Sequence, residues 1–350
     1  MNDNNFVKLG DVAHECRLTW SGEQTNIPIV GLEHLIPGEI ELSSWDSNIE
    51  HTFSKKFTKG QVLLGRRRVY LKKAVVAPCD GICSGDITVI ESTGGILPEL
   101  LPFVIQNDRF FDYAMQGSAG SLSPRVKWEH LKNYEFSLPP LAEQNVLAEK
   151  LWAAYRLKES YKKLLVATEE MVKSQFIEMF GDTHSSGNNS KRWKEVVDII
   201  NGKDYKTVQV EQGGYPVYGT GGEMARASEY LSPENSILLG RKGTIDKPLL
   251  IKEKYWNVDT AFAAVPDANY LNYIYFYWHC KTIDFKTLNK GTTLPSTTKV
   301  DLLELWIRIP EMGKQKEFAS IVNQADKSGF ELRKSIKTID IVIKSLINKK

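Results

Sequence analysis

Lysine and arginine residues recur in two stretches of the sequence that are also rich in glycine and hydroxyl-bearing residues. In the first stretch the basic candidates are Lys55, Lys56, Arg66, Arg67 and Arg68. In the second they are Arg241, Lys242 and Lys290, interleaved with Tyr218, Thr220, Thr244 and Thr292. Cationic groups neutralise phosphates, hydroxyl groups donate to phosphates or base edges, and glycine lets the backbone approach a duplex closely. The pattern favours DNA contacts, with simple solvation of charged loops as the alternative.

Catalytic constellations are not evident in the sequence. An adenine methyltransferase needs Asn or Asp before Pro-Pro-aromatic, and the sequence SLPPL around Pro139 lacks both flanks. The segment 219–222 (GTGG) has no strand-turn-helix context with a downstream acidic residue, so we interpret it as a turn rather than a nucleotide-binding loop. No Ser-His-Asp or Cys-His grouping stands out among the six histidines. We therefore predict no catalytic residue in this chain.

Two metal-based readings remain as weak alternatives. Asp267, Asp284 and Lys286 follow the order of two carboxylates and a lysine that a Mg²⁺-dependent nuclease uses. Cys79 and Cys83, with His14 or His279, offer zinc-ligand atoms, but the spacing is not CxxC and no second pair exists. We expect neither site to form, and the nuclease is kept as the alternative function.

Loops that contact DNA must be held in place by larger elements. The strongest sequence signal for such elements is an apolar stripe that occurs twice, at 147–179 and at 318–350. Its steps alternate four and three residues, the heptad spacing of a helix that packs against another helix. A shift of 171 residues carries the first copy onto the second, and it also carries Pro139 onto Pro310 and Gln144 onto Gln315. The predicted packing residues are Leu147, Leu151, Tyr161, Leu165, Val172, Val322, Leu332, Ile336, Ile339 and Ile343. The recurrence indicates a duplicated unit.

Each stripe predicts a helix of ~37 residues, roughly 55 Å long at about 1.5 Å per residue, which suits a spacer better than one wall of a compact core. We predict that Leu332, Ile336 and Ile339 of the second helix pack on Leu151, Tyr161 and Leu165 of the first. The alternative is that the helices serve assembly between molecules, as in a coiled-coil scaffold without DNA specificity.

The non-helical segments before each stripe predict two related domains. Short β-branched runs separated by Gly, Pro and Asn indicate that residues 1–138 form a mainly β domain, followed by a long helix at 139–181. The polar segment 182–192 is predicted to be a linker. A second domain at 193–310 and a second long helix at 311–350 complete the chain. Asp198 is matched to Asp11, and 236–240 (SILLG) to 61–65 (QVLLG).

Composition bounds the class of protein. The 350 residues suffice for two or three domains, and a net charge of +2 gives no strong indication of a nucleic-acid partner. The polar N-terminus and the lack of a long apolar run favour neither export nor a membrane span. The four cysteines are then expected to be reduced thiols of a cytoplasmic protein.

With these residues assembled, the chain resembles the specificity subunits of type I restriction–modification systems. The segments 215–222 (YPVYGTGG), 237–245 (ILLGRKGTI) and 256–262 (WNVDTAF) look like the body of a target recognition domain of that family. The segment 138–144 (LPPLAEQ) looks like the entry into its conserved helix. The resemblance spans the whole chain. The first domain departs from it with RRRVY in place of RKGTI, and the second helix entry, IPEMGKQ, lacks the Glu before Gln.

The resemblance implies an α+β fold in which two mixed, mainly β target recognition domains are separated by two long helices that form an antiparallel coiled coil with pseudo-two-fold symmetry. It implies that each domain reads one half of a bipartite, asymmetric site on double-stranded DNA. It also implies that two adenine-N6 methyltransferase subunits, which use S-adenosylmethionine, bind this non-catalytic scaffold. Restriction–translocase subunits that use ATP and Mg²⁺ complete such complexes, and no cofactor is expected on this chain itself.

Overall fold

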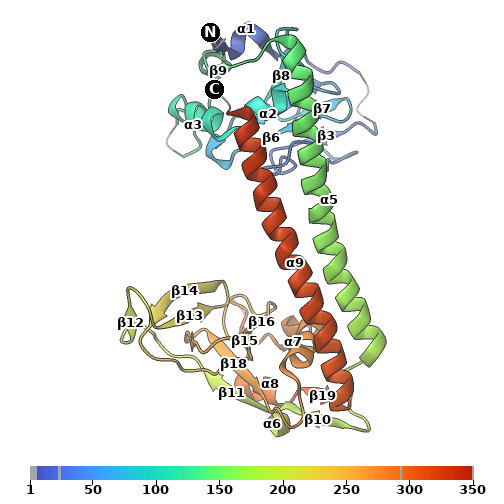
Figure 1. The fold of residues 1–350 in the computed structure, drawn as a ribbon, viewed down its shortest axis with the longest axis vertical. Helices are drawn as coiled ribbons and strands as arrows, with labels where there is room; N and C mark the ends of the chain where they lie inside the picture. Colours follow the sequence, from blue (N-terminus) through green and yellow to red (C-terminus); the bar gives the residue numbers. More distant parts are fainter. Residues whose placement is uncertain (1–5, 23–24, 121, 292–293, 349–350) are drawn as a thin grey trace. The chain divides into compact units, whose positions relative to one another are not determined.

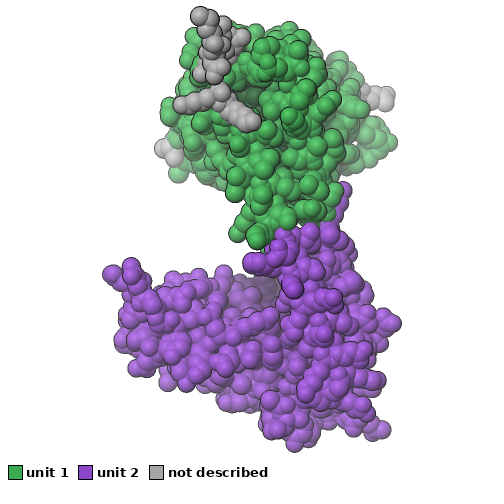
Figure 2. Space-filling view, viewed as in Figure 1, with its two compact units in different colours: residues 1–162, 333–350 green, residues 163–332 purple. Residues whose placement is uncertain are grey.

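The chain folds into two compact units in the computed structural model, which describes residues 6–22, 25–120, 122–291 and 294–348. Unit 1 holds residues 1–162 and 333–350, and unit 2 holds residues 163–332 (Figure 2). Each unit therefore contains one of the predicted domains together with a part of each long helix. No helix among the described residues is both long enough and apolar enough to cross a membrane.

The two long helices are α5 (Leu141–Phe180) and α9 (Met312–Ile347), which lie within the predicted ranges 139–181 and 311–350 (Figure 1). Their first residues are 171 positions apart, the same shift that relates the two apolar stripes. Every predicted packing residue on them is buried or half-buried. The stripe is therefore the covered face of both helices.

Unit 1 is built on a four-stranded antiparallel sheet in the order β2-β8-β5-β6, accompanied by a three-stranded sheet β3-β7-β4 and the pair β1-β9. Its strands are β1 (Phe6–Lys8), β2 (Ala13–Cys16), β3 (Ile29–Val30), β4 (Lys55–Phe57), β5 (Val62–Gly65), β6 (Ala74–Val76), β7 (Gly81–Cys83), β8 (Ile87–Ser92) and β9 (Glu135–Ser137). Its short helices are α1 (Leu9–Val12), η1 (Val69–Leu71), α2 (Leu101–Ile105), α3 (Asp108–Gln116) and α4 (Trp128–Leu131).

Unit 2 repeats the main sheet in the order β11-β18-β15-β16 and the pair β10-β19, while its second sheet has the order β12-β14-β13-β17. Its strands are β10 (Ser190–Arg192), β11 (Val197–Asn201), β12 (Gln209–Val210), β13 (Tyr215–Gly219), β14 (Gly222–Ala227), β15 (Ser236–Gly240), β16 (Leu249–Ile251), β17 (Trp256–Asn257), β18 (Ala261–Pro266) and β19 (Trp306–Arg308). Its short helices are α6 (Trp193–Val196), α7 (Tyr273–Thr282), η2 (Phe285–Leu288) and α8 (Lys299–Leu303).

Parts of both long helices complete the core of each unit. In unit 1, Leu151 and Tyr155 of α5 are buried in the main core, and Ile343 and Leu346 of α9 pack against the same core. In unit 2, the Phe176 ring of α5 lies 5.2 Å from the Phe318 ring of α9. Burying such side chains contributes roughly 1.5–3 kcal/mol each. The apolar stripe is thus shared between helix packing and domain packing.

A buried glutamine fastens each long helix to its own unit. Gln144 accepts a hydrogen bond from the Leu97 backbone N–H (2.9 Å) and donates to the Pro139 carbonyl (3.0 Å). Gln315 accepts from the Asn272 N–H (2.8 Å) and donates to the Pro310 carbonyl (2.8 Å). Each side chain satisfies backbone groups of the strand-to-helix turn and of a loop far away in sequence. The recurring Pro…Gln pattern in the sequence is therefore a recurring hydrogen-bonded joint.

One position in the first apolar stripe is charged, and it forms an ion pair. Lys158 interrupts the apolar series, and its Nζ lies 2.6 Å from Asp340 Oδ1 of α9 while its side chain is only 12% exposed. The shift of 171 residues places Gly329 at the corresponding position of the second stripe, and this glycine is buried. The Lys158 ammonium therefore has its charge compensated within unit 1.

Three sequence-based assignments need correction. The segment 182–192 is not a linker with nothing to bury, because it contains β10, paired with β19, and the buried Thr183. The counterpart of Asp11 is Glu195, not Asp198, since the two carboxylates accept from the backbone N–H of Lys8 and Arg192 respectively.

The third correction concerns Leu151, whose core is shared with the α9 residues Ile343, Leu346 and Ile347. These lie later in α9 than the predicted partners Leu332, Ile336 and Ile339. The pairing of those three residues with Tyr161 and Leu165 stays a prediction.

Replacing Gln315 tests whether its hydrogen bonds stabilise the start of helix α9 in unit 2. Gln315→Ala leaves the Asn272 N–H and the Pro310 and Tyr270 carbonyls without their partner in a buried turn, so we expect the free energy of unfolding to fall by about 1–3 kcal/mol. Gln324→Ala, an exposed glutamine of the same helix, should change it by less than about 0.5 kcal/mol. Urea denaturation measures both. Equal losses in the two variants would contradict the assignment.

Candidate nucleic-acid interface

The basic turn of unit 2, residues 241–244, directly follows strand β15. Gly240 ends the strand where a Cβ would lie 2.0 Å from the Thr244 carbonyl oxygen, so the turn closes only over glycine. Gly243 has a φ of +83°, the left-handed region that glycine adopts without strain. The two glycines of 237–245 (ILLGRKGTI) thus fold the chain sharply. Arg241, Lys242 and Thr244 are exposed on this turn.

A second segment, 290–297, is bonded to this turn through its backbone. The Gly243 N–H donates to the Pro295 carbonyl (2.9 Å), and the Thr297 N–H donates to the Arg241 carbonyl (3.0 Å). Lys290 belongs to this segment and pairs with Asp301 (2.6 Å). Thr292 lies outside the described residues. The sequence placed Arg241 and Lys290 in separate loops, and the structure brings their segments together.

Tyr218 and Thr220 lie in the β13–β14 hairpin, which is linked to the basic turn by 256–262 (WNVDTAF). The Val258 N–H donates to the Tyr218 carbonyl (3.1 Å), and Arg241 Nη1 donates to the Asp259 carbonyl (3.3 Å). Asn257 is fully buried and accepts from the Ser232 hydroxyl (2.7 Å). The side chains of Tyr218 and Thr220, the two predicted DNA contacts of this hairpin, are half-buried. Burial raises the pKa of the Tyr218 phenol, which therefore stays a neutral donor.

Unit 1 carries the same backbone arrangement at Arg66–Arg68. The Arg66 N–H donates to the Asp86 carbonyl (2.9 Å), as the Arg241 N–H does to Thr260 (2.9 Å). The Arg68 N–H donates to the Pro124 carbonyl (2.8 Å), as that of Gly243 does to Pro295. Arg66 therefore matches Arg241, and Arg68 matches Gly243. The RRR sequence that departs from the RKG pattern occupies the same turn.

Arg68 takes the left-handed conformation of its glycine counterpart, with a φ of +53°. Such a conformation costs a non-glycine residue free energy. Residues strained in this way cluster at functional sites. The Arg68 side chain is exposed. A residue that fits the turn poorly but carries a positive charge into solvent is a strong candidate for a phosphate contact.

Two other arginines of unit 1, Arg67 and Arg125, are bonded within the protein. Asp86 accepts two hydrogen bonds from Arg125 (2.7 and 3.1 Å) and lies 3.6 Å from Arg67, and Arg67 also donates to the Ser123 hydroxyl (3.0 Å). The Arg125 hydrogen bond and the neighbouring guanidinium charges hold the pKa of Asp86 below its ordinary value. The carboxylate fixes the direction of both guanidinium groups.

Lys55 and Lys56 lie on β4, apart from the turn in sequence. The Lys55 ammonium donates to the Ile87 carbonyl (2.6 Å), and that of Lys56 lies 5.6 Å from the Trp20 ring centre. Lys55 and Arg66 both line a cavity of about 540 Å³, where they and two other basic residues, Arg17 and Lys127, outnumber the carboxylates of Glu15 and Glu129. Arg66 Nε is buried without a hydrogen-bond partner among the described residues. Positive charge therefore collects beside the turn as well as on it.

Sequence reasoning missed Asp86, Ser123 and Arg125, as well as the segment 119–126 that holds the last two. A signal was present, because the shift of 171 carries Gly120 onto Gly291 and Pro124 onto Pro295. The Pro124 and Pro295 carbonyls accept from equivalent turn residues, and the spacing of the shared proline and glycine reflects that role.

The residues of the nuclease alternative are not assembled into a metal site. Asp284 accepts from the Lys286 N–H (3.1 Å) as the cap of η2, and Lys286 Nζ lies 3.0 Å from Asp246. Asp267 accepts from the Asn269 N–H (2.9 Å). Among the described residues, the His, Cys, Asp and Glu groups close enough to share a metal include neither Asp267 nor Asp284.

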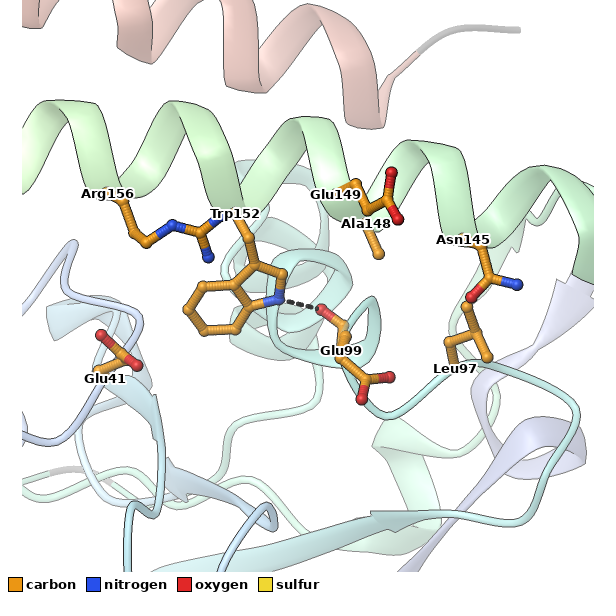
Figure 3. Close-up of a pocket in the computed structure, with 8 residues that line it drawn as sticks. All are labelled: Glu41, Leu97, Glu99, Asn145, Ala148, Glu149, Trp152 and Arg156. Atoms are coloured by element: carbon orange, nitrogen blue, oxygen red, sulfur yellow. Dashed lines mark hydrogen bonds between the residues drawn. The ribbon is translucent and has the colours of Figure 1, made fainter.

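A separate hollow of about 440 Å³ lies against α5 in unit 1 (Figure 3). Trp152 lies over it and donates from Nε1 to the Glu99 carbonyl (2.9 Å). Three glutamates, Glu41, Glu99 and Glu149, and one arginine, Arg156, line it. This net negative lining repels phosphates, so the hollow is not part of the nucleic-acid interface.

Comparison with known proteins agrees with this geometry. Residues 185–339 match the family described as type I restriction modification DNA specificity domain. The type I restriction enzyme EcoDI specificity subunit of Escherichia coli is 26% identical over 205 residues, which cover 55% of this chain and 45% of that protein. The chain thus matches less than half the length of this curated relative.

Solved structures extend the likeness of the fold to the whole chain. The S subunit of a type I restriction-modification system from M. genitalium has a TM-score of 0.64 at 12% identity, covering 100% of this chain and 98% of that one. A second structure comes from work on the complex assembly and conformational transition of the type I R-M system. It has a TM-score of 0.58 at 18% identity and covers 99% of this chain and 96% of that one. The resemblance to specificity subunits is confirmed.

The strained turn residue gives a test that separates folding from binding. Arg68→Gly should leave the free energy of unfolding unchanged or raise it by up to ~1 kcal/mol, because glycine suits the left-handed conformation. If Arg68 contacts a phosphate, the slope of log K against log salt concentration for duplex DNA should shrink in magnitude by about 0.9.

Fluorescence anisotropy at several salt concentrations measures that slope. Lys150→Ala, which removes an exposed lysine from α5, is the control for net charge and should leave the slope unchanged. A wild-type slope in Arg68→Gly would make Arg68 a solvated surface residue.

Proposed function

We propose that the chain is the sequence-specific DNA-recognition subunit of a type I restriction–modification complex, because residues 185–339 match the type I restriction modification DNA specificity domain family. Each unit reads one half of a bipartite, asymmetric site on double-stranded DNA. The subunit itself is non-catalytic. The observation that carries the proposal is the basic turn present in both units, with Arg66 and Arg241 at equivalent backbone positions.

The two turns share a backbone and differ in side chains, which is what reading two different half-sites requires. The turn of unit 1 has the sequence Arg-Arg-Arg, of which Arg68 is exposed, and that of unit 2 has Arg-Lys-Gly-Thr. An arginine contacts guanine O6 and N7 with two hydrogen bonds, whereas a lysine acts as a point charge. Different residues on one frame give different base preferences without a change of fold, so we assign the asymmetry of the DNA site to these turns.

The long helices act as the spacer of this proposal, packed as an antiparallel coiled coil. Supporting this, unit 1 pairs the early part of α5 with the late part of α9 (Lys158 with Asp340), and unit 2 pairs the late part of α5 with the early part of α9 (Phe176 with Phe318). Helix α5 has 40 residues, about 60 Å of helix at 1.5 Å per residue. Equivalent major-groove faces recur about every 34–36 Å, a separation that such helices can hold.

The complex supplies the chemistry that this chain lacks. Two adenine-N6 methyltransferase subunits bind the scaffold and use S-adenosylmethionine, and they extrude the target base for methylation. Restriction–translocase subunits add ATP- and Mg²⁺-dependent cleavage. This chain needs no cofactor of its own, and a cytoplasmic location follows because its target is DNA. The E. coli relative is a specificity subunit by name, and the second solved structure concerns assembly of a type I system.

Arg241 is the residue with which to test direct reading. Selection from a randomised duplex library by the subunit with its methyltransferase partner should enrich one split motif. Arg241→Ala should relax one position of one half-site by about 1–3 kcal/mol, because a bidentate contact to a base is lost. Arg241→Lys should keep overall affinity but lose that preference, since lysine lacks the planar fork.

Lys327→Ala, an exposed charge on α9, should leave the motif unchanged. Weakening at all sequences alike would make Arg241 a phosphate contact. A wild-type subunit that enriches no split motif would contradict the proposed function.

A further inference from the structure

A histidine, a cysteine and a glutamate lie together on one face of the main sheet of unit 1. His14 and Cys16 are two residues apart on β2, so their side chains point to the same face. On the adjacent strand β8, Glu91 is the direct cross-strand partner of His14. One ligand atom from each residue lies within 4.8 Å of the other two. Strand register therefore brings nitrogen, sulfur and oxygen donors to one point.

The separations between these atoms suit a tetrahedral metal ion. Cys16 Sγ lies 3.7 Å from His14 Nε2 and 3.2 Å from Glu91 Oε2. For Zn²⁺ with bonds of about 2.3 Å to sulfur and about 2.0–2.2 Å to nitrogen and oxygen, tetrahedral angles put such atoms about 3.6 Å apart. The two sulfur separations are close to this value, and the His14 nitrogen and the Glu91 oxygen lie within 4.8 Å of each other.

Gln61 holds two of the three donors in position. Its Nε2 donates to Glu91 Oε2 (3.0 Å) and contacts Cys16 Sγ (3.3 Å), and its Oε1 accepts from the Thr58 N–H (2.8 Å). The Thr58 bond fixes which end of the amide faces the cluster, and the side chain is only 6% exposed. A buried amide that orients ligating side chains is the usual outer partner of a protein metal site.

The cluster also offers access and an open coordination position. Cys16 is 6% exposed, whereas His14 and Glu91 are exposed to solvent. An ion can therefore enter from the solvent side and keep water as its fourth ligand. Mixed sulfur, nitrogen and carboxylate donors favour Zn²⁺ over Mg²⁺ or Ca²⁺, which prefer oxygen ligands alone.

The equivalent sheet of unit 2 shows that the trio is not needed to build this architecture. Strand β11 pairs with β18 as β2 pairs with β8, and the corresponding positions hold Asp198, Ile200 and Val265. These residues cannot bind Zn²⁺ as a set, yet the strand order is the same. Cys79 and Cys83, the thiols considered from the sequence, take no part in the cluster.

We propose that His14, Cys16 and Glu91 bind one Zn²⁺ ion, with Gln61 orienting the site. On binding, the Cys16 S–H bond breaks, its proton passes to solvent, and the thiolate forms the metal–sulfur bond. The ion links β2 to β8 through their side chains, so it stabilises the unit that carries the Arg66–Arg68 turn. This inference is independent of the proposed function and departs from the expectation that the chain binds no metal.

Cobalt(II) is the direct probe, since a thiolate ligand gives an intense charge-transfer band and tetrahedral coordination gives strong visible bands. The full chain, without a histidine tag and after treatment with a chelator, is titrated with Co²⁺ and then with Zn²⁺. We expect one equivalent of Co²⁺ to bind with both spectral features and Zn²⁺ to displace it. We also expect a higher thermal unfolding midpoint with the ion bound.

Metal binding by single-residue variants distinguishes the proposed ligands from residues that do not bind the ion. His14→Ala and Glu91→Gln change exposed side chains and should fold, yet each should weaken binding, and Cys16→Ser should abolish the charge-transfer band. Gln61→Ala should reduce affinity by about 10–100-fold. Cys79→Ser is the matched thiol control and should behave as wild type.

His34→Ala tests the other candidate group, Glu33, His34 and Asp46, in which His34 Nδ1 already accepts from the Gly31 N–H (2.9 Å). It too should behave as wild type. The proposal is overturned if the wild-type chain takes up no stoichiometric Co²⁺. It is also overturned if the charge-transfer band survives in Cys16→Ser or disappears in Cys79→Ser.

Discussion

The architecture depends on how two long helices cover their apolar stripes. A helix of 40 residues cannot bury such a stripe against itself, so the stripe must be covered by another helix, by a domain, or by both. Here it is both, because α5 and α9 each contribute side chains to the core of each unit. The buried glutamines Gln144 and Gln315 then fix the point at which each helix leaves its sheet.

The two units differ in the side chains of their basic turns, where a substitution has little effect on folding. The basic turns are held by backbone hydrogen bonds to the segments that carry Pro124 and Pro295, so their side chains are not needed to maintain the turn. Glycine at 243 makes the turn easy to close, and Arg68 shows that a different residue is accepted at that position with some strain. A stable backbone with replaceable side chains is how a fold can change the DNA sequence it recognises while keeping its partners.

Local patterns in the sequence predicted the helices and the duplication, because a heptad stripe and a repeated Pro…Gln entry are each visible over a few turns. Long-range register was not predictable. Asp86 meets Arg125 across 39 residues, and Glu91 meets Cys16 across 75, only after strands have paired. The segment 182–192 was wrongly predicted for the same reason, since its polar residues find partners on elements far away in the sequence, such as β19 and α7. The turn at Arg241 was visible from its two glycines, and its DNA contact stays a prediction. The internal ion pairs of Arg67 and Lys290 could not be seen in the sequence.

The central claim is that two independently variable units on one frame read the two halves of one site. The most direct measurement is a base-resolution map of N6-methyladenine in cells that carry the cognate methyltransferase and either this chain or a version with residues 193–310 exchanged for those of a relative. The account predicts that one half of a split motif changes while the other half and the gap between them remain. A change in both halves, or a methylation pattern that does not respond to the exchange, would contradict it.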